Sequence, residues 1–279
     1  MSVISEAPNG LHAVEGILNY LQPTAEKPYQ YTYDPPPGHE RTNYAYQGHP
    51  VPVWDARPIA PQLSLDREGF ALVKAPTATS DFYDEDALRQ AYYRETERLV
   101  ARETGAARVV IFDHTIRRRL AGVEDRSHGQ PRQPVPRVHN DYTEVSGPQR
   151  VRDVLPDEAE ALLKKRFAVI NIWRPIRGPL YDSPLALADA RSVAKRDFIA
   201  SDLIYPDRTG ETYSVAFNPA HRWFYFRAMG TDEVVLIKVY DSAENVARFT
   251  AHAAFDDPTT PPDAVPRESI ELRSLVFWD

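Results

Sequence analysis

The second half of the chain consists largely of short apolar segments separated by turns, and this pattern limits the fold more than any other feature. Five segments have the length of a strand and are rich in β-branched and aromatic residues; they are residues 167–173, 211–217, 223–227, 233–240 and 267–277. Proline, glycine and aspartate occupy the turns between them. Such a pattern is typical of sandwiches and jelly rolls, whereas βαβ folds alternate strands with long helices. The sequence therefore predicts a mainly β fold with flanking helices.

Two helices and one further strand are predicted outside these segments. Residues 81–104 have an apolar face at helical spacing, acidic residues in the first turn and Gly105 as a stop signal. Residues 108–113 form an apolar strand, after which the triple arginine 117–119 is expected to face solvent in a polar loop; contact with a phosphate or a carboxylate is the less favoured alternative. A second helix is expected at residues 157–166.

The first 64 residues differ from the rest because proline and tyrosine are frequent there and no helical period is present. Alternating tyrosines and the turn signal PPPG at 35–38 indicate extended segments. The many aromatic side chains favour docking over disorder. The prediction is a single domain, residues 65–279, on which an extended N-terminal arm, residues 1–64, is packed.

Composition restricts the partners and the place of action. The chain has 279 residues and a formal net charge of -7, which argues against broad electrostatic contact with nucleic acid or an anionic membrane. It has no run of about 18 apolar residues that would span a membrane, and its first residues lack the basic segment of a secretory signal. We expect a cytoplasmic protein that acts on a small molecule, and the sequence leaves a homodimer open.

Several kinds of active site are excluded by missing motifs. The chain has no GxGxxG, Walker, GxSxG or HExxH segment, which removes the usual support for nucleotide binding, α/β-hydrolase chemistry and zinc proteolysis. It has no cysteine, so a metal ion would have to be held by histidine, aspartate or glutamate.

His139 and Asp141 are the first candidates for such a metal site. They lie two residues apart in the segment RVHNDYT. Side chains two residues apart on a strand point to the same face, so an imidazole nitrogen and a carboxylate oxygen would lie side by side. A third ligand from elsewhere would complete the two-histidine, one-carboxylate arrangement that leaves positions open on Fe(II).

Two histidines compete for the position of the third ligand. His252 follows an apolar strand and precedes a strand that begins with Arg267 and Ser269. These two side chains share a face and would offer a guanidinium and a hydroxyl group to a carboxylate; Arg273 lies on the same face and is the alternative partner. His221 lies closer in sequence to the His-x-Asp pair, but no Arg-x-Ser strand follows it directly. We favour His252 and expect the other histidine to be a core or substrate-facing residue.

The order His-x-Asp, distant His and Arg-x-Ser resembles the Fe(II)/2-oxoglutarate-dependent oxygenase superfamily. More narrowly, five segments are similar to the hydroxylase/desaturase (CmcJ-related) family of fungal and bacterial secondary metabolism: NYLQPTAEKPYQYTYDPPPG, VHNDYTEVSGPQRV, INIWRPIRGPLYDSPLALAD, NPAHRWFYF and HAAFDDPTTPPDAVPRESIE. The resemblance covers nearly the whole chain and implies a jelly roll of the double-stranded β-helix type. It identifies neither the substrate nor the outcome of the oxidation.

The resemblance also implies cofactors and site residues. Fe(II) would be held by His139, Asp141 and His252, and the far carboxylate of 2-oxoglutarate by Arg267 with help from Ser269. Together with O2, these cofactors oxidise unactivated C–H bonds, which gives hydroxylation, desaturation or a related radical oxidation. The expected substrate is a small, largely apolar natural-product metabolite.

Further residues near the motifs are candidates for binding the substrate, namely Tyr142, Asn171, Trp173, Arg174 and His221. Because Asn171 and Trp173 are two residues apart on a predicted strand, they are expected to point the same way.

Two functions of other kinds fit part of the pattern. A cupin-like metal enzyme that does not use 2-oxoglutarate would bind metal without depending on the oxoacid. A non-catalytic jelly-roll binding protein would use the His-x-Asp pair only for hydrogen bonds and would bind no stoichiometric iron.

Overall fold

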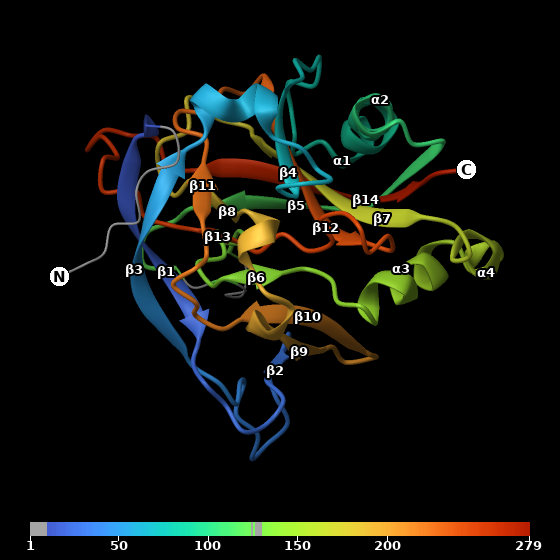
Figure 1. Ribbon diagram of the computed structural model, residues 1–279, viewed down its shortest axis with the longest axis horizontal. Coiled ribbons are helices and arrows are strands. Elements are labelled where there is room, and N and C mark those ends of the chain that lie inside the picture. Colours follow the sequence, from blue (N-terminus) through green and yellow to red (C-terminus); the bar gives the residue numbers. More distant parts are fainter. Residues whose placement is uncertain (1–9, 124, 126–129) are drawn as a thin grey trace.

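Two β-sheets make up most of the fold in the computed structural model, which describes residues 10–123, 125 and 130–279 (Figure 1). The nine-stranded sheet contains, in spatial order, β1 (Ala13–Leu21), β3 (Tyr46–Asp55), β11 (Trp223–Tyr225), β8 (Leu185–Ala188), β13 (His252–Ala254), β6 (His139–Asn140), β10 (Thr209–Val215), β9 (Phe198–Ile204) and β2 (Tyr29–Tyr31). The five-stranded sheet contains β4 (Phe70–Lys74), β12 (Glu233–Asp241), β7 (Phe167–Pro175), β14 (Glu268–Phe277) and β5 (Arg108–Arg118).

Along two stretches of the chain, from β5 to β8 and from β11 to β14, successive strands alternate between the two sheets. From β5 in the five-stranded sheet the chain passes to β6, back to β7 and across to β8. After the hairpin of β9 and β10, it continues from β11 to β12, β13 and β14, again changing sheet at each step. This winding brings β6 and β13, which are far apart in sequence, next to each other.

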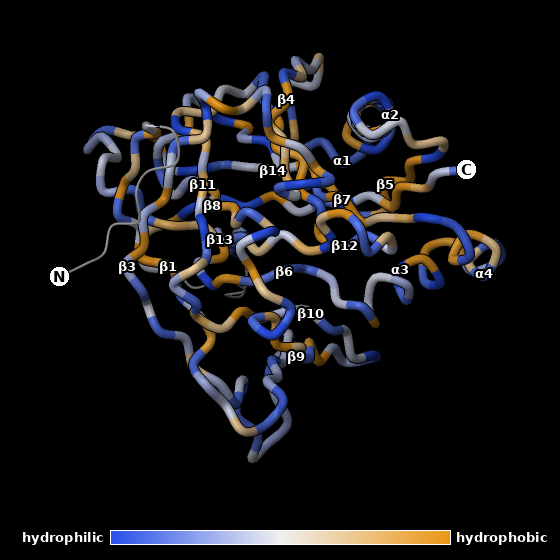
Figure 2. The backbone as a smooth tube through the Cα atoms, viewed as in Figure 1, coloured by the Kyte–Doolittle hydropathy of each residue, from blue (hydrophilic) through white to orange (hydrophobic). Residues whose placement is uncertain are grey.

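The hydrophobic core lies between the sheets, and a second apolar layer covers the outer face of the five-stranded sheet. Trp173 of β7 and Phe224 of β11 belong to the inner cluster. Ile170 and Ile172, on the opposite face of β7, pack with residues of α2 (Tyr93–Thr104) such as Leu99. Because both faces of the sheet are covered, β7 is buried along its whole length. Figure 2 shows hydrophobic residues along β5 and β7 where these strands pass α2.

Helices lie on this outer face and at one end of the sheets (Figure 1). Besides α2 they are α1 (Glu85–Ala87), a π-helical turn (Leu88–Tyr92), α3 (Ser146–Val154) and α4 (Ala159–Leu162). Short 3-10 turns elsewhere in the fold span Arg57–Gln62, Ala190–Ser192 and Lys195–Asp197. The helix predicted over 81–104 begins at residue 85, because the Asp84 carboxylate accepts a hydrogen bond from the Ala87 amide at 3.0 Å. It ends as predicted at Gly105, which has a φ of +66°.

The second predicted helix, over 157–166, is reduced to the four residues of α4, whose first turn has no side-chain cap. The helix α3 has no counterpart among the sequence predictions, because Gly147 and Pro148 in its first turn are poor helix formers in general. No helix in the described part of the chain is long and apolar enough to cross a membrane.

The N-terminal segment contributes strands to the larger sheet. β1 and β3 pair antiparallel along nine residue pairs, and β3 continues the sheet by pairing parallel with β11. β2 pairs with β9 at the other edge. Residues 1–9 of the expected arm lie outside the described residues, and the division of the chain at residue 64 stays a prediction.

The strand predicted at 108–113 is longer than expected. β5 continues to Arg118 and pairs with β14 from end to end, so two residues of the triple arginine belong to a strand instead of a loop. Residues 124 and 126–129 of the predicted loop lie outside the described residues.

Candidate metal centre and its cavity

Two neighbouring strands bring His139 and His252 together. β6 begins at His139 and pairs antiparallel with β13, in which His252 is the direct partner of His139. Asn140 points the other way and is fully buried. Its Nδ2 donates to the Val239 carbonyl of β12 at 2.8 Å, and its Oδ1 accepts from the Thr250 amide at 3.1 Å. One side chain thus ties β6 to β12 and to the segment that leads into His252.

Asp141 completes a compact cluster with the two histidines. One nitrogen or oxygen atom from each of the three residues lies within 4.8 Å of the other two. Nε2 of His139 is 3.5 Å from Oδ1 of Asp141, and the two imidazole centroids are 4.4 Å apart. His252 is buried, and the side chains of His139 and Asp141 are only 12% and 17% exposed.

Hydrogen bonds orient both imidazoles in the same manner. Nδ1 of His139 donates to the Arg137 carbonyl, and Nδ1 of His252 donates to the Thr250 carbonyl, each at 2.9 Å. This places the proton on Nδ1 and leaves the Nε2 lone pair for a metal. Burial, reinforced by the neighbouring His252, lowers the pKa of His139 to about 4, so the ring is neutral, which is the form that binds metals.

The two oxygens of Asp141 have different surroundings. Oδ2 accepts a hydrogen bond from Asn171 Nδ2 at 2.6 Å and lies 3.6 Å from Nε of Arg273, whereas Oδ1 faces His139. Although burial alone would raise the pKa of Asp141, the contact with His139 and the charge of Arg273 hold it well below its ordinary value. The carboxylate is therefore ionised, with one oxygen directed to the histidines.

The chemistry of this donor set fits Fe(II). Two imidazoles and one carboxylate on a single face form the combination found in non-haem iron oxygenases, and three positions remain for other ligands. The Oδ1 atom of Asn171 is buried beside this cluster and has no hydrogen-bond partner among the described residues.

Arg267 lies next to the cluster, just before β14. Its Nε donates to Ser269 Oγ at 3.1 Å and its Nη1 to the Ser183 carbonyl at 2.8 Å, and its guanidinium lies 4.8 Å from the Trp173 ring centroid. No carboxylate of the described residues forms an ion pair with it. Burial, with repulsion from Arg117, lowers the pKa of Arg267 to about 9. A buried cation without a counter-ion is a natural site for an anionic ligand.

Arg273, the alternative partner for a carboxylate, is already bonded to acidic groups. Its guanidinium contacts Glu271 at 2.9 Å, Asp113 at 3.2 Å and Asp141 at 3.6 Å. These carboxylates raise the pKa of Arg273 despite its burial. The geometry favours Arg267 over Arg273 as the group that is free to take an added carboxylate.

Two adjoining cavities meet at the cluster. The smaller one is bordered by all three clustered side chains together with Trp173 and Arg267. The larger one, of about 570 Å³, is lined by His139, Asp141 and Tyr142 and opens toward α3 and the β9–β10 hairpin. A ligand in either cavity would touch the candidate metal ligands.

Known proteins resemble the chain over nearly its whole length. Residues 18–277 match the family model described as an oxidoreductase/YMDC permease-like domain. The chain is 32% identical over 272 residues to the Fe(II)/2-oxoglutarate-dependent dioxygenase nvfI of Aspergillus novofumigatus, which covers 94% of this chain and 96% of that protein. It belongs to the Fe(II)/2-oxoglutarate-dependent dioxygenases. It is also 34% identical over 263 residues to the hydroxylase/desaturase efuI of Hormonema carpetanum, covering 85% and 86% of the two chains.

A solved structure confirms the fold of this dioxygenase. The iron and alpha-ketoglutarate-dependent endoperoxidase NvfI superposes with a TM-score of 0.86 at 30% identity, over 95% of this chain and 98% of that chain. The predicted jelly roll of the double-stranded β-helix type is confirmed, as are the enzyme class and its use of Fe(II), 2-oxoglutarate and O2. These relatives do not favour a cupin-like enzyme without 2-oxoglutarate or a non-catalytic binding protein.

Two of the expected substrate-binding residues do not face the dioxygenase cavity. Arg174 lies on the outer face of β7, where its guanidinium donates to the Tyr92 hydroxyl and to the carbonyls of Ala75 and Thr231, each at 2.7 Å. The side-chain alternation that turns Asn171 and Trp173 inward turns Arg174 outward.

His221, the rival third ligand, is the second of these residues. Its Nε2 lies 3.1 Å from Asp197 Oδ2 and its Nδ1 lies 3.1 Å from the Tyr20 hydroxyl, which also accepts from Trp223 Nε1 at 2.7 Å. The structure thus brings His252, and not His221, to the His-x-Asp pair.

One residue beside the cavity is not among the site residues that the sequence favours. Arg117, expected in solvent, is the direct partner of Ser269 across β5 and β14 and borders both cavities. Its Nη1 donates to the Gln133 carbonyl at 2.7 Å, and burial lowers its pKa to about 10. Arg118 points outward to Glu268 at 3.3 Å. The alternation of β5 carries the signal that separates these two arginines.

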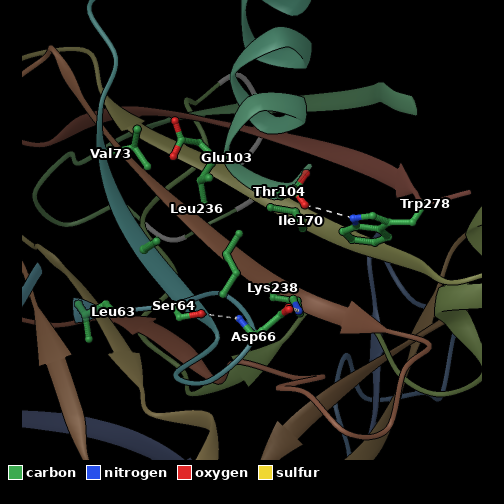
Figure 3. A pocket seen from close by; sticks show the side chains of 12 residues that line it. Leu63, Ser64, Asp66, Val73, Glu103, Thr104, Ile170, Leu236, Lys238 and Trp278 are labelled. Atoms are coloured by element: carbon green, nitrogen blue, oxygen red, sulfur yellow. Dashed lines mark hydrogen bonds and ion pairs between the residues drawn. The ribbon is translucent and has the colours of Figure 1, made fainter. Parts of the chain in front are cut away.

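A separate cavity of about 250 Å³ lies on the outer face of the five-stranded sheet beside α2 (Figure 3). The Lys238 amine in its wall is bonded to Asp66 and, at 2.8 Å, to Asp241, and the Trp278 indole donates to the Thr104 carbonyl at 3.1 Å. Both polar groups are thus bonded within the protein.

Proposed function

We propose that His139, Asp141 and His252 hold Fe(II) in this dioxygenase, and that Arg267, with Ser269, holds the far carboxylate of 2-oxoglutarate. The observation that carries the proposal is the convergence of three metal donors with a buried arginine lacking an acidic partner on one small cavity. Arg117, on the neighbouring strand, adds a second positive charge beside the dianionic oxoacid.

Fe(II), 2-oxoglutarate and O2 together supply the oxidising chemistry, and the protein groups position and shield it. The Arg137 and Thr250 carbonyls fix the imidazoles. Asn171 and Arg273 hold the outer oxygen of Asp141, which leaves the inner oxygen for the metal. The larger cavity gives a substrate access to the same side of the cluster.

The substrate proposed is a small natural-product metabolite that loses hydrogen from a C–H bond. Relatives named as a hydroxylase/desaturase and a dioxygenase support hydroxylation, desaturation or a related radical oxidation. Tyr142, Asn171 and Trp173 are the sequence candidates that border the two cavities or contact Asp141, and we propose that they shape the substrate pocket. We also propose that the enzyme acts in the cytoplasm, as a monomer or homodimer, without a nucleic acid or membrane partner; the net charge of -7 supports this.

The test is spectroscopic. Fe(II) added with 2-oxoglutarate in the absence of O2 is expected to give the weak visible charge-transfer band of the chelate. His139→Ala, Asp141→Ala and His252→Ala should abolish the band, whereas His221→Ala should retain it. Arg267→Gln should raise the 2-oxoglutarate concentration needed for half-maximal band by roughly tenfold or more, since it removes a charge-assisted contact.

Two results would contradict these assignments. A full band in any of the three ligand variants would remove that residue from the metal site. Unchanged 2-oxoglutarate binding in Arg267→Gln, with loss in Arg273→Gln, would move the carboxylate site to Arg273.

A further inference from the structure

Arg137 faces the larger cavity one strand step before the proposed iron ligand His139. Val135, Arg137, His139 and Asp141 all line this cavity, as expected for alternate residues of an extended segment. Two residues along a strand span about 7 Å. The Arg137 side chain therefore lies beside the space that a substrate must enter to reach the metal.

The guanidinium of Arg137 has no counter-ion within the described part of the chain. Its backbone carbonyl accepts from His139, but its side chain forms no hydrogen bond or ion pair with the residues that the structure describes. The residue is half-buried. Taking a cation partly out of water without a partner is unfavourable, and a bound anion offsets this.

The acidic groups of the cavity wall cannot serve as that partner, because each is bonded elsewhere. The pairs are Asp113 and Asp141 with Arg273, Asp125 with Arg132, Asp153 with Arg150, and Glu211 with Lys27 and Thr143. Among the described residues, Arg137 is thus the one arginine of the cavity wall whose charge no carboxylate matches.

Other parts of the same wall are apolar. Tyr142 and Val145 lie on the side of α3, and Leu203 and Tyr205 lie on the β9–β10 hairpin. Val145 is 68% exposed, so an apolar surface reaches the mouth of the cavity.

We infer that the substrate is an amphipathic metabolite with one carboxylate, which Arg137 binds while the apolar body contacts Tyr142 and Leu203. A planar guanidinium matches a carboxylate with two parallel hydrogen bonds, and its single charge matches a monoanion. This inference rests on the proposed function and adds a charged group to the largely apolar substrate expected from the sequence. Arg137 is then a specificity-determining residue close to the reacting centre.

The experiment measures binding of matched probes to the full chain loaded with Fe(II) and 2-oxoglutarate without O2. The probes are naphthaleneacetate with naphthaleneacetamide and decanoate with decanamide, titrated by calorimetry. Within at least one pair the acid should bind roughly tenfold more tightly than the amide, and added salt should reduce this preference. Arg137→Gln should abolish the preference, and Arg137→Lys should keep part of it.

Arg208→Gln is the matched control, because Arg208 lines the same cavity but has a carboxylate partner, Asp207, at 3.3 Å. It should keep the preference for the acid. Equal binding of acid and amide by the wild type in both pairs, or an undiminished preference in Arg137→Gln, would overturn the inference while the charge-transfer band stays intact. A wild type that forms no band would instead contradict the proposed function itself.

Discussion

At the scale of single residues, the site depends on side chains that hold the ligands as much as on the ligands. Asn171 donates to the outer oxygen of Asp141 at 2.6 Å, and Nε of Arg273 lies 3.6 Å from the same atom. If the amide of Asn171 were turned over, its oxygen would face the negatively charged carboxylate of Asp141. Because two acceptors repel each other, the amide must present its NH2 group to Asp141. The inner oxygen of Asp141 is left for the metal contact proposed above.

Replacing Asn171 tests this support. Asn171→Leu should weaken Fe(II) binding by about 10–100-fold, because the carboxylate loses the donor that orients it. Binding is measured by anaerobic titration of the apoprotein. Asn218→Leu is the control. The Asn218 amide donates to the Asp197 carboxylate at 3.0 Å in the same manner, but this contact lies outside the proposed metal site. An affinity in Asn171→Leu equal to that of the control would show that Asp141 needs no such support.

The residues of the site differ in how far the sequence predicts them. His139 and Asp141 can be placed together from sequence because side chains two residues apart in an extended segment point the same way, although β6 itself ends at Asn140 and Asp141 follows it directly. The Arg-x-Ser strand after His252 favours this histidine over His221 already in the sequence. The pairing of β6 with β13, which joins segments more than a hundred residues apart, then places it beside His139. Arg117 is missed because the sequence predicts a strand only as far as residue 113. A bulge opposite Arg273 and Ser274 also shifts the register of β5, so alternation counted from the start of the strand would point Arg117 the wrong way.

At the scale of elements, the short strands β6 and β13 position the two histidines proposed as metal ligands, and neighbouring turns hold these strands in place. The turn before β4 is one such support. Gly69 has a φ of +90°, and its carbonyl accepts from the Thr250 hydroxyl at 3.0 Å and from the Lys238 amide at 2.8 Å. Thr250 in turn accepts from His252. The turn, β12 and the start of β13 are thus held in one arrangement.

Gly69→Ala should disturb both the fold and the metal site. A Cβ at this position would overlap the Thr250 hydroxyl, and the positive φ is unfavourable for alanine. We expect a loss of about 2 kcal/mol or more in the free energy of unfolding, with weaker Fe(II) binding because Thr250 orients His252. Urea unfolding and metal titration measure the two effects.

Gly105→Ala is the control that separates the effect of backbone strain from the effect of the contact with Thr250. Gly105 also has a positive φ, of +66°, but a Cβ there would meet nothing within 4 Å. This variant should lose only about 1 kcal/mol and bind Fe(II) as the wild type does. Normal metal binding in Gly69→Ala would show that the turn does not act on His252.

The elements that the sequence predicts well are those whose pattern is local. The strands near 167–173, 233–240 and 267–277 are confirmed because their apolar runs are long and bounded by turns. The missed helix α3 contains glycine and proline; its Gly147 packs so closely on the Tyr240 ring that a side chain would overlap it. Tertiary packing, and not helix propensity, stabilises that element.

At the scale of the whole molecule, the N-terminal segment is joined to the jelly roll by a buried chain of polar groups. Trp223 of β11 donates to the Tyr20 hydroxyl of β1, Tyr20 donates to His221, and His221 donates to the Asp197 carboxylate. Because Asp197 only accepts, the proton of the neutral imidazole lies on Nε2 and Nδ1 accepts from Tyr20. Both ring nitrogens of His221 therefore form hydrogen bonds that join β1 to the segment around Asp197. This structural role explains why His221 is absent from the cluster of candidate metal ligands.

The buried hydrogen bonds of His221 predict a pH dependence of the protein's stability. Burial lowers the pKa of His221 below its ordinary value, although Asp197 opposes the shift. Below about pH 6.5 the unfolded chain therefore takes up a proton at His221 that the folded protein does not take up. The free energy of unfolding consequently falls as the pH falls, by at most about 1.4 kcal/mol per pH unit. His221→Gln should lower the stability at pH 7.5 but reduce the further loss between pH 7.5 and 5.5. Urea unfolding at the two pH values measures both effects, with the exposed His39→Gln as the control that keeps the wild-type slope. An unchanged pH slope in His221→Gln would show that the buried imidazole takes up its proton as readily in the folded protein as in the unfolded chain.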